Sequence, residues 1–336
     1  MIILGATVWI FFSNLHLYGQ VKSNEPESVA ESRQYWKSPV TGKTYQLIFS
    51  DEFNGKNDEV GPFWSYRGED WTHAKTRTVS YNNKKYGIMA VKSAVKQKDG
   101  NMELHVYKKT GTPDEIYTGG ISTINSLRLQ YGYFETRVNF SRCRQSWGHW
   151  PAFWVMYTFP DEESVPADYD MFSQGTELDI FEYISTNNRM HTNLNWRVKD
   201  TVSANPASRG LHDMKKHSWP LGAEAGWHVV ALEWTPEEVI WYCDGKVKLR
   251  RKKNEGKKFV PSAFQYVCFS MSAGTWGGGG NVADPKNPLP ARVQYDYCRV
   301  YQTAGQKAYY KLPETGNVWT LLHANERINF LTDDKN

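Results

Sequence analysis

The sequence Glu177-Leu178-Asp179-Ile180-Phe181-Glu182 places three carboxylates within a single strand-like run. Successive side chains of a β-strand point to opposite faces of the sheet, so Glu177 and Asp179 share one face. In a regular strand Glu182 would point to the other face. One extra residue at Ile180 or Phe181, forming a β-bulge, would return Glu182 to the face of the other two carboxylates. Because adjacent acids on one face repel each other, we interpret this run as a functional site rather than a solvated strand face.

Short alternating runs of apolar and polar residues continue over most of the chain. Turn residues such as Asp99-Gly100-Asn101 and Asp244-Gly245 separate them. This pattern predicts an all-β sandwich or barrel, without a long amphipathic helix or an internal repeat. The clearest strand-like runs are residues 45–49, 102–107, 133–138, 227–234, 239–243 and 293–301.

The composition restricts the class of protein. A chain of 336 residues allows one large domain or two smaller ones. Aromatic residues make up 15% of it, which favours a large sandwich core or an aromatic-lined groove. The net charge of +4 is spread over both signs, which argues against a nucleic-acid-binding protein. No spacing of Cys and His resembles a zinc site, and four Cys are too few for a disulfide scaffold.

Cys243 and Cys298 lie in strand-like runs, where a small buried thiol is expected. The sequence does not decide the disulfide state of these two residues, of Cys143 or of Cys268.

Both ends of the chain depart from the strand pattern. Residues 1–20 begin with an apolar run that is too short to span a membrane and fits a signal peptide or an N-terminal anchor. We therefore expect a secreted, periplasmic or cell-surface protein with no other membrane contact. The polar residues 21–37 predict a linker, and residues 304–336 form a C-terminal appendage of unknown role.

Two charged segments are candidates for long loops. Residues 158–176 precede the carboxylate run and are rich in Asp and Glu, which favours a functional wall or lid. Residues 246–258 follow a hairpin-like turn and are rich in Lys and Arg. The second segment is either a solvated loop or a patch that attracts anionic glycans.

Two carboxyl groups on either side of a glycosidic bond are the basic equipment of a glycosidase. One must be ionised to attack the anomeric carbon, and the other must be protonated to protonate the leaving oxygen, so their surroundings must separate their pKa values. Asp179, between the two glutamates, can hydrogen-bond to one and couple its titration to both. Neighbours on one strand suit the separation of about 5–5.5 Å found in retaining enzymes. The run therefore predicts a double displacement through a covalent glycosyl-enzyme.

The segments on either side of the run suit a sugar-binding site. Trp150 and Trp154 belong to the indole-rich run 147–154 and are either platforms for sugar rings or core residues. On the next predicted strand, His191, Asn193 and Asn195 share one face. His191 either tunes Glu182 or is structural, and we count His191 and Asn193 among the candidate binding residues.

Two further binding candidates lie farther away in the sequence. Arg137 shares a strand face with Glu135 and either faces the substrate or pairs with that glutamate. Trp276 precedes four glycines, in a segment predicted to be a flexible loop that borders the cleft.

The carboxylate run resembles the bulged E-x-D-x-x-E signature of glycoside hydrolase family 16. Other motifs of that family follow in its order, and the resemblance covers residues 38–303, which are identified as the catalytic domain. These motifs are Phe49–Gly55 (the opening strand), Tyr131–Arg137 (Y-G-x-F-E-x-R), Trp150–Trp154 (the W-P-A-F-W of laminarinase-like members), Ala231–Pro236 and Trp241–Gly245 (the back-strand hairpin) and Asp296–Tyr301 (the closing strand).

The resemblance implies a concanavalin-like β-jelly-roll of two curved antiparallel sheets, with the substrate in a concave cleft. It implies endo-hydrolysis of β-linked polysaccharide with retention of configuration. By matching positions, Glu177 is the nucleophile, Glu182 is the acid/base and Asp179 assists between them. Trp150 and Trp154 would bind glucan near the point of cleavage.

The family also bears on cofactors and partners. Some members hold a structural Ca²⁺ away from the cleft, and Asp296 is the matching residue here. No cofactor is required for the reaction. We expect a monomer whose partner is its polysaccharide substrate, with no nucleic-acid partner.

The sequence leaves the substrate open. The tryptophan run favours β-1,3- or mixed-linkage β-1,3/1,4-glucan. The basic segment 246–258, together with Arg142 and Arg144, leaves open an agar-, porphyran- or carrageenan-type galactan or a host O-glycan. The alternative of another class is a non-catalytic, lectin-like sandwich, which would have no need of both outer glutamates.

Overall fold

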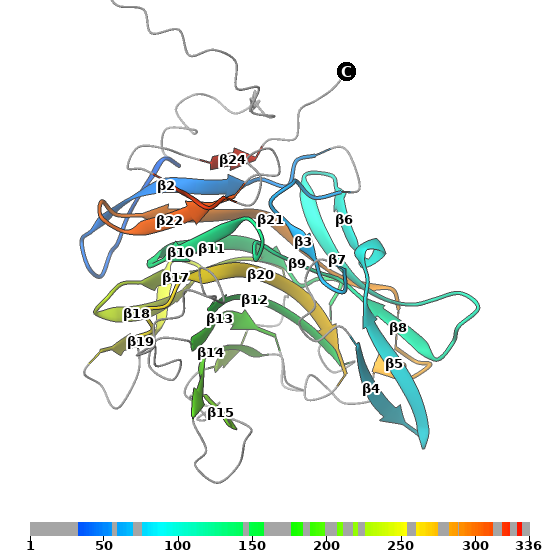
Figure 1. Ribbon diagram of the computed structural model, residues 1–336. Helices are drawn as coiled ribbons and strands as arrows, with labels where there is room; N and C mark the ends of the chain where they lie inside the picture. The colour runs from blue at the N-terminus through cyan, green and yellow to red at the C-terminus, as the bar shows by residue number, and fades with distance from the viewer. Residues whose placement is uncertain are drawn as a thin grey trace, which may run out of the picture.

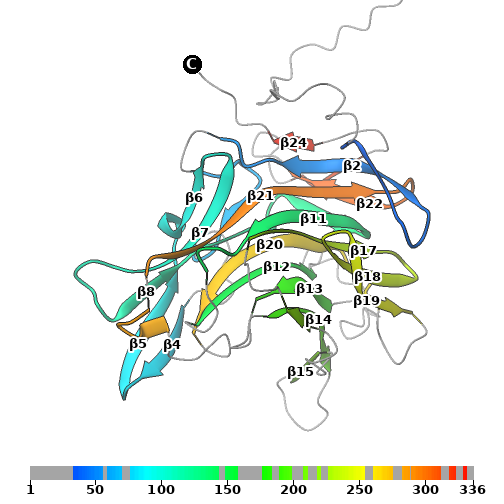
Figure 2. The ribbon, with the colours of Figure 1, turned by 180° about the vertical axis from the view of Figure 1, so that it is seen from behind.

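Two β-sheets stacked on one another make up the described part of the chain (Figures 1 and 2). The computed structural model describes residues 33–55, 59–69, 76–143, 148–157, 176–183, 189–198, 207–210, 218–220, 226–253, 260–274, 282–287, 289–311, 318–322 and 328–330. The second sheet arches under the first, and its concave side faces away from the first sheet. The predicted all-β jelly-roll of two curved sheets is confirmed.

The first sheet has 13 strands among the described residues. Nine of them lie in the order β19 (Lys246–Lys252), β18 (Glu238–Cys243), β17 (Trp227–Trp234), β11 (Gly132–Asn139), β21 (Ala291–Gln302), β7 (Asn101–Lys108), β8 (Glu115–Thr118), β5 (Lys84–Ala90) and β4 (Thr76–Tyr81). The others, which pair beside this row, are β1 (Tyr35–Lys37), β2 (Thr44–Asp51), β6 (Val95–Lys98) and β24 (Ile328–Phe330).

The second sheet has 11 strands in the described part of the chain. Eight lie in the order β15 (Ala207–Gly210), β14 (Arg189–Val198), β13 (Thr176–Glu182), β12 (His149–Tyr157), β20 (Gln265–Ala273), β10 (Leu127–Gln130), β22 (Lys307–Tyr310) and β23 (Thr320–Leu321). The others are β3 (Ser65–Tyr66), β9 (Gly120–Ser122) and β16 (Ser218–Pro220), and a short 3₁₀ helix spans Lys92–Ala94.

The hydrophobic core lies between the two sheets because alternate residues of each strand point inward. On β20 these are Val267, Phe269, Met271 and Ala273, whereas Tyr266 and Cys268 lie on the other face, which is the concave side. Aromatic rings fill much of this core. The rings of Phe153 and Phe269 stack with their centroids 4.5 Å apart. The inner faces of the strands therefore fix which side chains remain for a site on the concave side.

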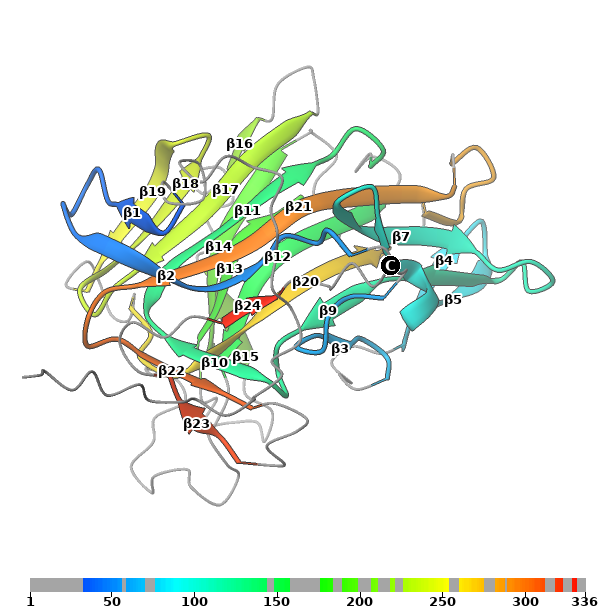
Figure 3. The same cartoon turned by 90° about the horizontal axis from the view of Figure 1, so that it is seen from above.

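Three segments predicted to lie outside the strands are part of the sheets. Residues 35–37, predicted to end a linker, form β1 and pair with β2. Residues 246–252, predicted to be a loop, form the edge strand β19, where charged side chains discourage pairing with another chain. Residues 307–330, predicted to belong to an appendage, contribute β22 and β23 to the second sheet and β24 to the first (Figure 3).

All four cysteines, at positions 143, 243, 268 and 298, are buried and carry free thiols. The predicted burial of Cys243 and Cys298 is confirmed. Across the described residues, no helix is long and apolar enough to cross a membrane. The predicted signal segment, residues 1–20, lies outside the described residues.

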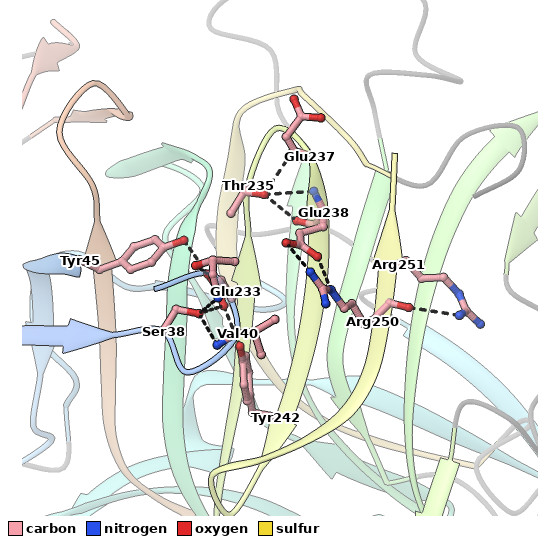
Figure 4. A network of polar contacts seen from close by, with 11 residues as sticks. Ser38, Val40, Tyr45, Glu233, Thr235, Glu237, Glu238, Tyr242, Arg250 and Arg251 are labelled. Carbon is pink, nitrogen blue, oxygen red and sulfur yellow. Dashed lines mark hydrogen bonds and ion pairs between the residues drawn. The ribbon is translucent and has the colours of Figure 1, made fainter. Parts of the chain in front are cut away.

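Glu233 on β17 is 0% exposed and ties the start of the described chain to the first sheet (Figure 4). Its carboxylate accepts hydrogen bonds from the hydroxyls of Ser38 (2.7 Å), Thr41 (2.7 Å), Tyr45 (2.9 Å) and Tyr242 (2.7 Å). Burial and the charge of Glu233 raise the pKa of both tyrosines, so both phenols remain hydrogen-bond donors. The cluster compensates a buried carboxylate with four donors.

We expect Glu233→Gln to lower the free energy of unfolding by about 2–4 kcal/mol, because its amide NH₂ would face hydroxyls that now donate to a charged acceptor. Urea denaturation followed by tryptophan fluorescence measures this loss. The matched control is Glu237→Gln, at an exposed turn position, which should stay within about 0.5 kcal/mol of the wild type. Equal stabilities of the two variants would contradict a stabilising role for the Glu233 cluster.

Candidate active site

The carboxylate run lies on β13 and contains the predicted bulge. On the β12 side, Phe181 pairs with Phe153 and Asp179 with Trp154, so Ile180 is the extra residue. Ile180 and Phe181 both point into the core. Because two consecutive side chains point inward, the side chain of Glu182 returns to the face that carries the other two carboxylates.

A side chain of the first sheet hydrogen-bonds to the backbone of the bulge. Trp241 of β18 is fully buried, and its indole N–H donates a hydrogen bond to the backbone carbonyl of Asp179 at 2.9 Å. This carbonyl lies at the point where the ladder between β13 and β14 is interrupted. The indole of Trp241 therefore gives a hydrogen-bond partner to a backbone carbonyl at the interruption of the β-ladder.

The three carboxylates form one hydrogen-bonded group. The side chain of Asp179, which is 2% exposed, hydrogen-bonds to both Glu177 and Glu182. On β14, the amide of Asn195 donates to Glu177 Oε1 at 3.0 Å and to Asp179 Oδ2 at 2.8 Å. Asn193 in turn donates to Asn195 Oδ1 at 2.8 Å and so fixes the orientation of that amide.

Burial and mutual repulsion favour protonated forms in this group. Burial, followed by the charges of Glu182 and Glu177, raises the pKa of Asp179 well above its ordinary value. Burial and the charge of Glu177 raise the pKa of Glu182 to about 8, although hydrogen bonds from Trp150 and Asp179 oppose this shift. At neutral pH, Glu182 therefore carries a proton that it can donate.

The two predicted platform tryptophans lie on β12, directly beside β13. The indole N–H of Trp150 donates to Glu182 Oε1 at 3.1 Å, and that of Trp154 donates to Ser270 Oγ at 3.2 Å. Both rings are buried and lie on the strand face opposite the core residues Phe153 and Val155, which is the concave side that also carries the carboxylates. The structure thus brings these rings to the carboxylates, and their contact with a sugar stays a prediction.

His191 and Asn193 also lie at the carboxylates. In the β13–β14 ladder, His191 pairs with Glu182, and Asn193 pairs with Asp179. Both side chains are buried. Asn195, which pairs with Glu177, is a further residue of the candidate site that the sequence placed on the same face but did not single out. The register between the two strands is the signal that identifies it.

Arg137 is not at this site. It lies on β11 in the first sheet, on the face opposite the core residues Phe134 and Val138. Its guanidinium lies 4.5 Å from the ring centroid of Trp227 and donates to Asp296 Oδ2 at 2.8 Å. The expectation that Arg137 binds substrate is therefore wrong, because alternation gives the face of a strand but not the sheet to which it belongs.

The predicted calcium ligand is engaged in the same ion pair. Because the Arg137 guanidinium contacts the Asp296 carboxylate, a positive charge already compensates the acid where a cation would bind. A role of Asp296 as a calcium ligand stays a prediction. Trp276 and the acidic segment 158–175 lie outside the described residues.

Comparison with known proteins bears on the same residues. A family model described as "Glycosyl hydrolases family 16" matches residues 82–299, a range that includes the whole carboxylate run. Keratan-sulfate endo-1,4-beta-galactosidase of Sphingobacterium multivorum is 26% identical over 270 residues, which cover 78% of this chain and 56% of that protein. This chain thus spans little more than half the length of that relative.

Two further similarities concern glucan-degrading proteins. Beta-glucanase of Rhodothermus marinus is 29% identical over 234 residues, which cover 60% of this chain and 75% of that protein. The laminarinase catalytic domain of Thermotoga maritima has the same fold, with a TM-score of 0.56 at 20% identity over 77% of this chain and 98% of that domain. The family model matches more than half of a chain that carries the bulged carboxylate strand in a two-sheet jelly-roll, and so the chain belongs to glycosyl hydrolases family 16.

Proposed function

We propose that this chain cleaves internal bonds of a β-linked polysaccharide with retention of configuration. Glu177 is the nucleophile and Glu182 is the general acid and base. The observation that carries the proposal is the contact of Asp179 with both glutamates, which holds the two outer carboxyl groups on either side of one shared neighbour. That spacing suits the short separation of a retaining pair, about 5–5.5 Å.

In the first step, the carboxylate of Glu177 attacks the anomeric carbon while Glu182 donates its proton to the departing glycosidic oxygen. The bond to the leaving sugar breaks and a glycosyl ester to Glu177 forms. Asn195 and Asp179 hold the attacking carboxylate in place through their hydrogen bonds. Trp150 holds the acid through its indole N–H.

In the second step, Glu182 is ionised and removes a proton from a water molecule that attacks the anomeric carbon. The ester bond to Glu177 breaks, the carboxylate is restored, and Glu182 recovers its proton. Two inversions at one carbon give net retention. Burial and the acidic neighbours raise the pKa of Asp179 and so favour its protonated form, which can donate a hydrogen bond to Glu177 when the ester is released.

For the substrate, we propose β-1,3- or mixed-linkage β-1,3/1,4-glucan first. The indole rings of Trp150 and Trp154 beside the carboxylates suit the flat faces of β-linked sugar residues, and the similarity to beta-glucanase agrees with a glucan. A galactan or host glycan is the second candidate. It is favoured by the similarity to the keratan-sulfate enzyme and by two arginines, Arg67 and Arg77, near Trp150.

The test is a screen of the purified chain on laminarin, lichenan, agarose, porphyran, carrageenan, keratan sulfate and mucin. Product sizes should show internal cleavage, and proton NMR of the first products should show the β-anomer before mutarotation. An α-anomer as first product would contradict the retaining mechanism. Binding of a polysaccharide without cleavage would favour the lectin-like alternative.

A further inference from the structure

Two arginines, one directly after β3 of the second sheet and one on β4 of the first, line the same small cavity. Arg67 directly follows β3 and is 4% exposed, and its Nη1 donates to Ser272 Oγ on β20 at 2.9 Å. Arg77 lies on β4 and is partly exposed. Both line one small cavity with Ser272, and we call them the arginine pair. The proposed mechanism gives neither residue a role.

The arginine pair lies across the second sheet from the proposed acid. Ala152 on β12 pairs with Glu182 on one side and with Ser270 on the other. Ser270 pairs with Gly120 of β9, and the carbonyl of Gly120 accepts the backbone N–H of Arg67 at 2.9 Å. One row of neighbouring residues therefore runs across the sheet from Glu182 to Arg67.

Trp150 connects the arginine pair to the acid. Its indole N–H contacts Glu182, and the guanidinium carbon of Arg77 lies 5.6 Å from its ring centroid. A guanidinium over an indole face is attracted by the ring quadrupole and so keeps its orientation. A sugar bound beside Glu182 and against Trp150 would present its substituents to Arg77.

Gly120 packs against both Arg67 and the backbone carbonyl of Phe269. A Cβ at this glycine would lie 3.1 Å from Cδ of Arg67 and 3.3 Å from its Cβ, which is tighter than an ordinary contact. Burial and the nearby charge of Arg77 lower the pKa of Arg67 to about 10, so two positive charges repel each other across the shared cavity. An anion bound at the partly exposed guanidinium of Arg77 would offset this repulsion.

We propose that the arginine pair binds an anionic substituent, a sulfate ester or a carboxylate, on the glycan residue that packs against Trp150. The inference rests on the proposed hydrolysis at Glu182. Arg77, the more exposed of the two, contacts the anion through its planar fork of N–H donors. Arg67, which is buried, adds its positive charge. The pair therefore favours the second candidate substrate, a charged galactan or host glycan, over a neutral glycan with the same backbone.

The experiment compares glycans that differ only in charge. Keratan sulfate is paired with its desulfated form, laminarin with chemically sulfated laminarin, and sialylated mucin with desialylated mucin. We expect Arg77→Gln to reduce the wild-type preference in kcat/KM for the charged member of a pair by about 10- to 100-fold. Arg77→Lys should keep part of this preference. Arg137→Gln is the matched control, because Arg137 also lies over a tryptophan ring, but on the opposite face of the sandwich.

A binding measurement separates this inference from the proposed function. Calorimetry with the Glu177→Gln protein compares the affinity for sulfated and desulfated keratan oligosaccharides, with and without Arg77→Gln. Tighter binding of the sulfated form, lost with Arg77, supports the arginine pair even if the wild type hydrolyses nothing. Equal affinity for both forms, together with equal kcat/KM on every pair, overturns the inference even if neutral glucan is cleaved. A preference confined to sialylated mucin assigns the pair to carboxylates rather than to sulfate.

Discussion

Glu177→Ala is expected to reduce kcat on every polysaccharide that the protein cleaves by at least about 10⁴-fold. The substitution removes the atom that forms the glycosyl ester, and the two remaining carboxyl groups, Asp179 and Glu182, lie at other positions of the same strand. Steady-state release of reducing ends measures the loss. Circular dichroism must show that the variant is folded.

Rescue of the Glu177→Ala variant by azide is a second test of Glu177 as the nucleophile. A small anion can enter the space left by the Glu177 carboxylate and attack the anomeric carbon in one displacement, which gives an α-glycosyl azide. Proton NMR of the product identifies the anomer. Glu237→Gln, at an exposed turn, is the control and should retain full activity without azide. A β-configured azide product from Glu177→Ala would contradict the assignment of Glu177 as the nucleophile.

Glu182→Ala is expected to reduce kcat/KM on polysaccharide by about 10²- to 10⁴-fold, which is the usual contribution of a general acid. The loss in the first step should be much smaller with an aryl glycoside, because a phenolate of low pKa leaves without a proton. With azide, this variant should form a β-glycosyl azide, because azide attacks the intact ester on Glu177. Equal losses on both kinds of substrate would count against the acid/base role.

The pH profile tests the same residue. Since the first step needs the protonated form of Glu182, and the pKa of Glu182 is raised to about 8, kcat/KM of the wild type should fall as the pH rises through about 8. On an aryl glycoside, Glu182→Ala should lose this alkaline decline. A decline that persists in the variant would assign it to another group.

Much of this site could be predicted from local sequence. Strand alternation places Glu177 and Asp179 on one face, and the misfit of Glu182 implies one extra residue. The sequence could not decide between Ile180 and Phe181 as that residue, because both are apolar and both face the core. The pairing of Phe181 with Phe153 decides it, and pairing depends on a strand far away in the chain.

The errors have the same origin. Arg137 alternates correctly on its strand, but only the sheet topology shows that β11 belongs to the sheet without the carboxylates. The charged run 246–252 lacks the apolar alternation of a buried strand, since it is an edge strand on which Leu249 is the buried residue. The arginine pair carries no local signal, because Arg67 and Arg77 meet only through strand pairing and a shared cavity.

The hydrogen bond from Trp241 to the carbonyl of Asp179 makes the spacing of the two layers part of the catalytic geometry. The carboxylates lie on the second sheet, whereas Trp241, which hydrogen-bonds to the backbone at their bulge, belongs to the first sheet. A change in core volume near Trp241 would therefore shift the bulge that positions the carboxylates, in addition to disturbing the packing of the core. Any redesign of this scaffold for a new polysaccharide has to hold the interior constant there and vary the walls of the concave side instead.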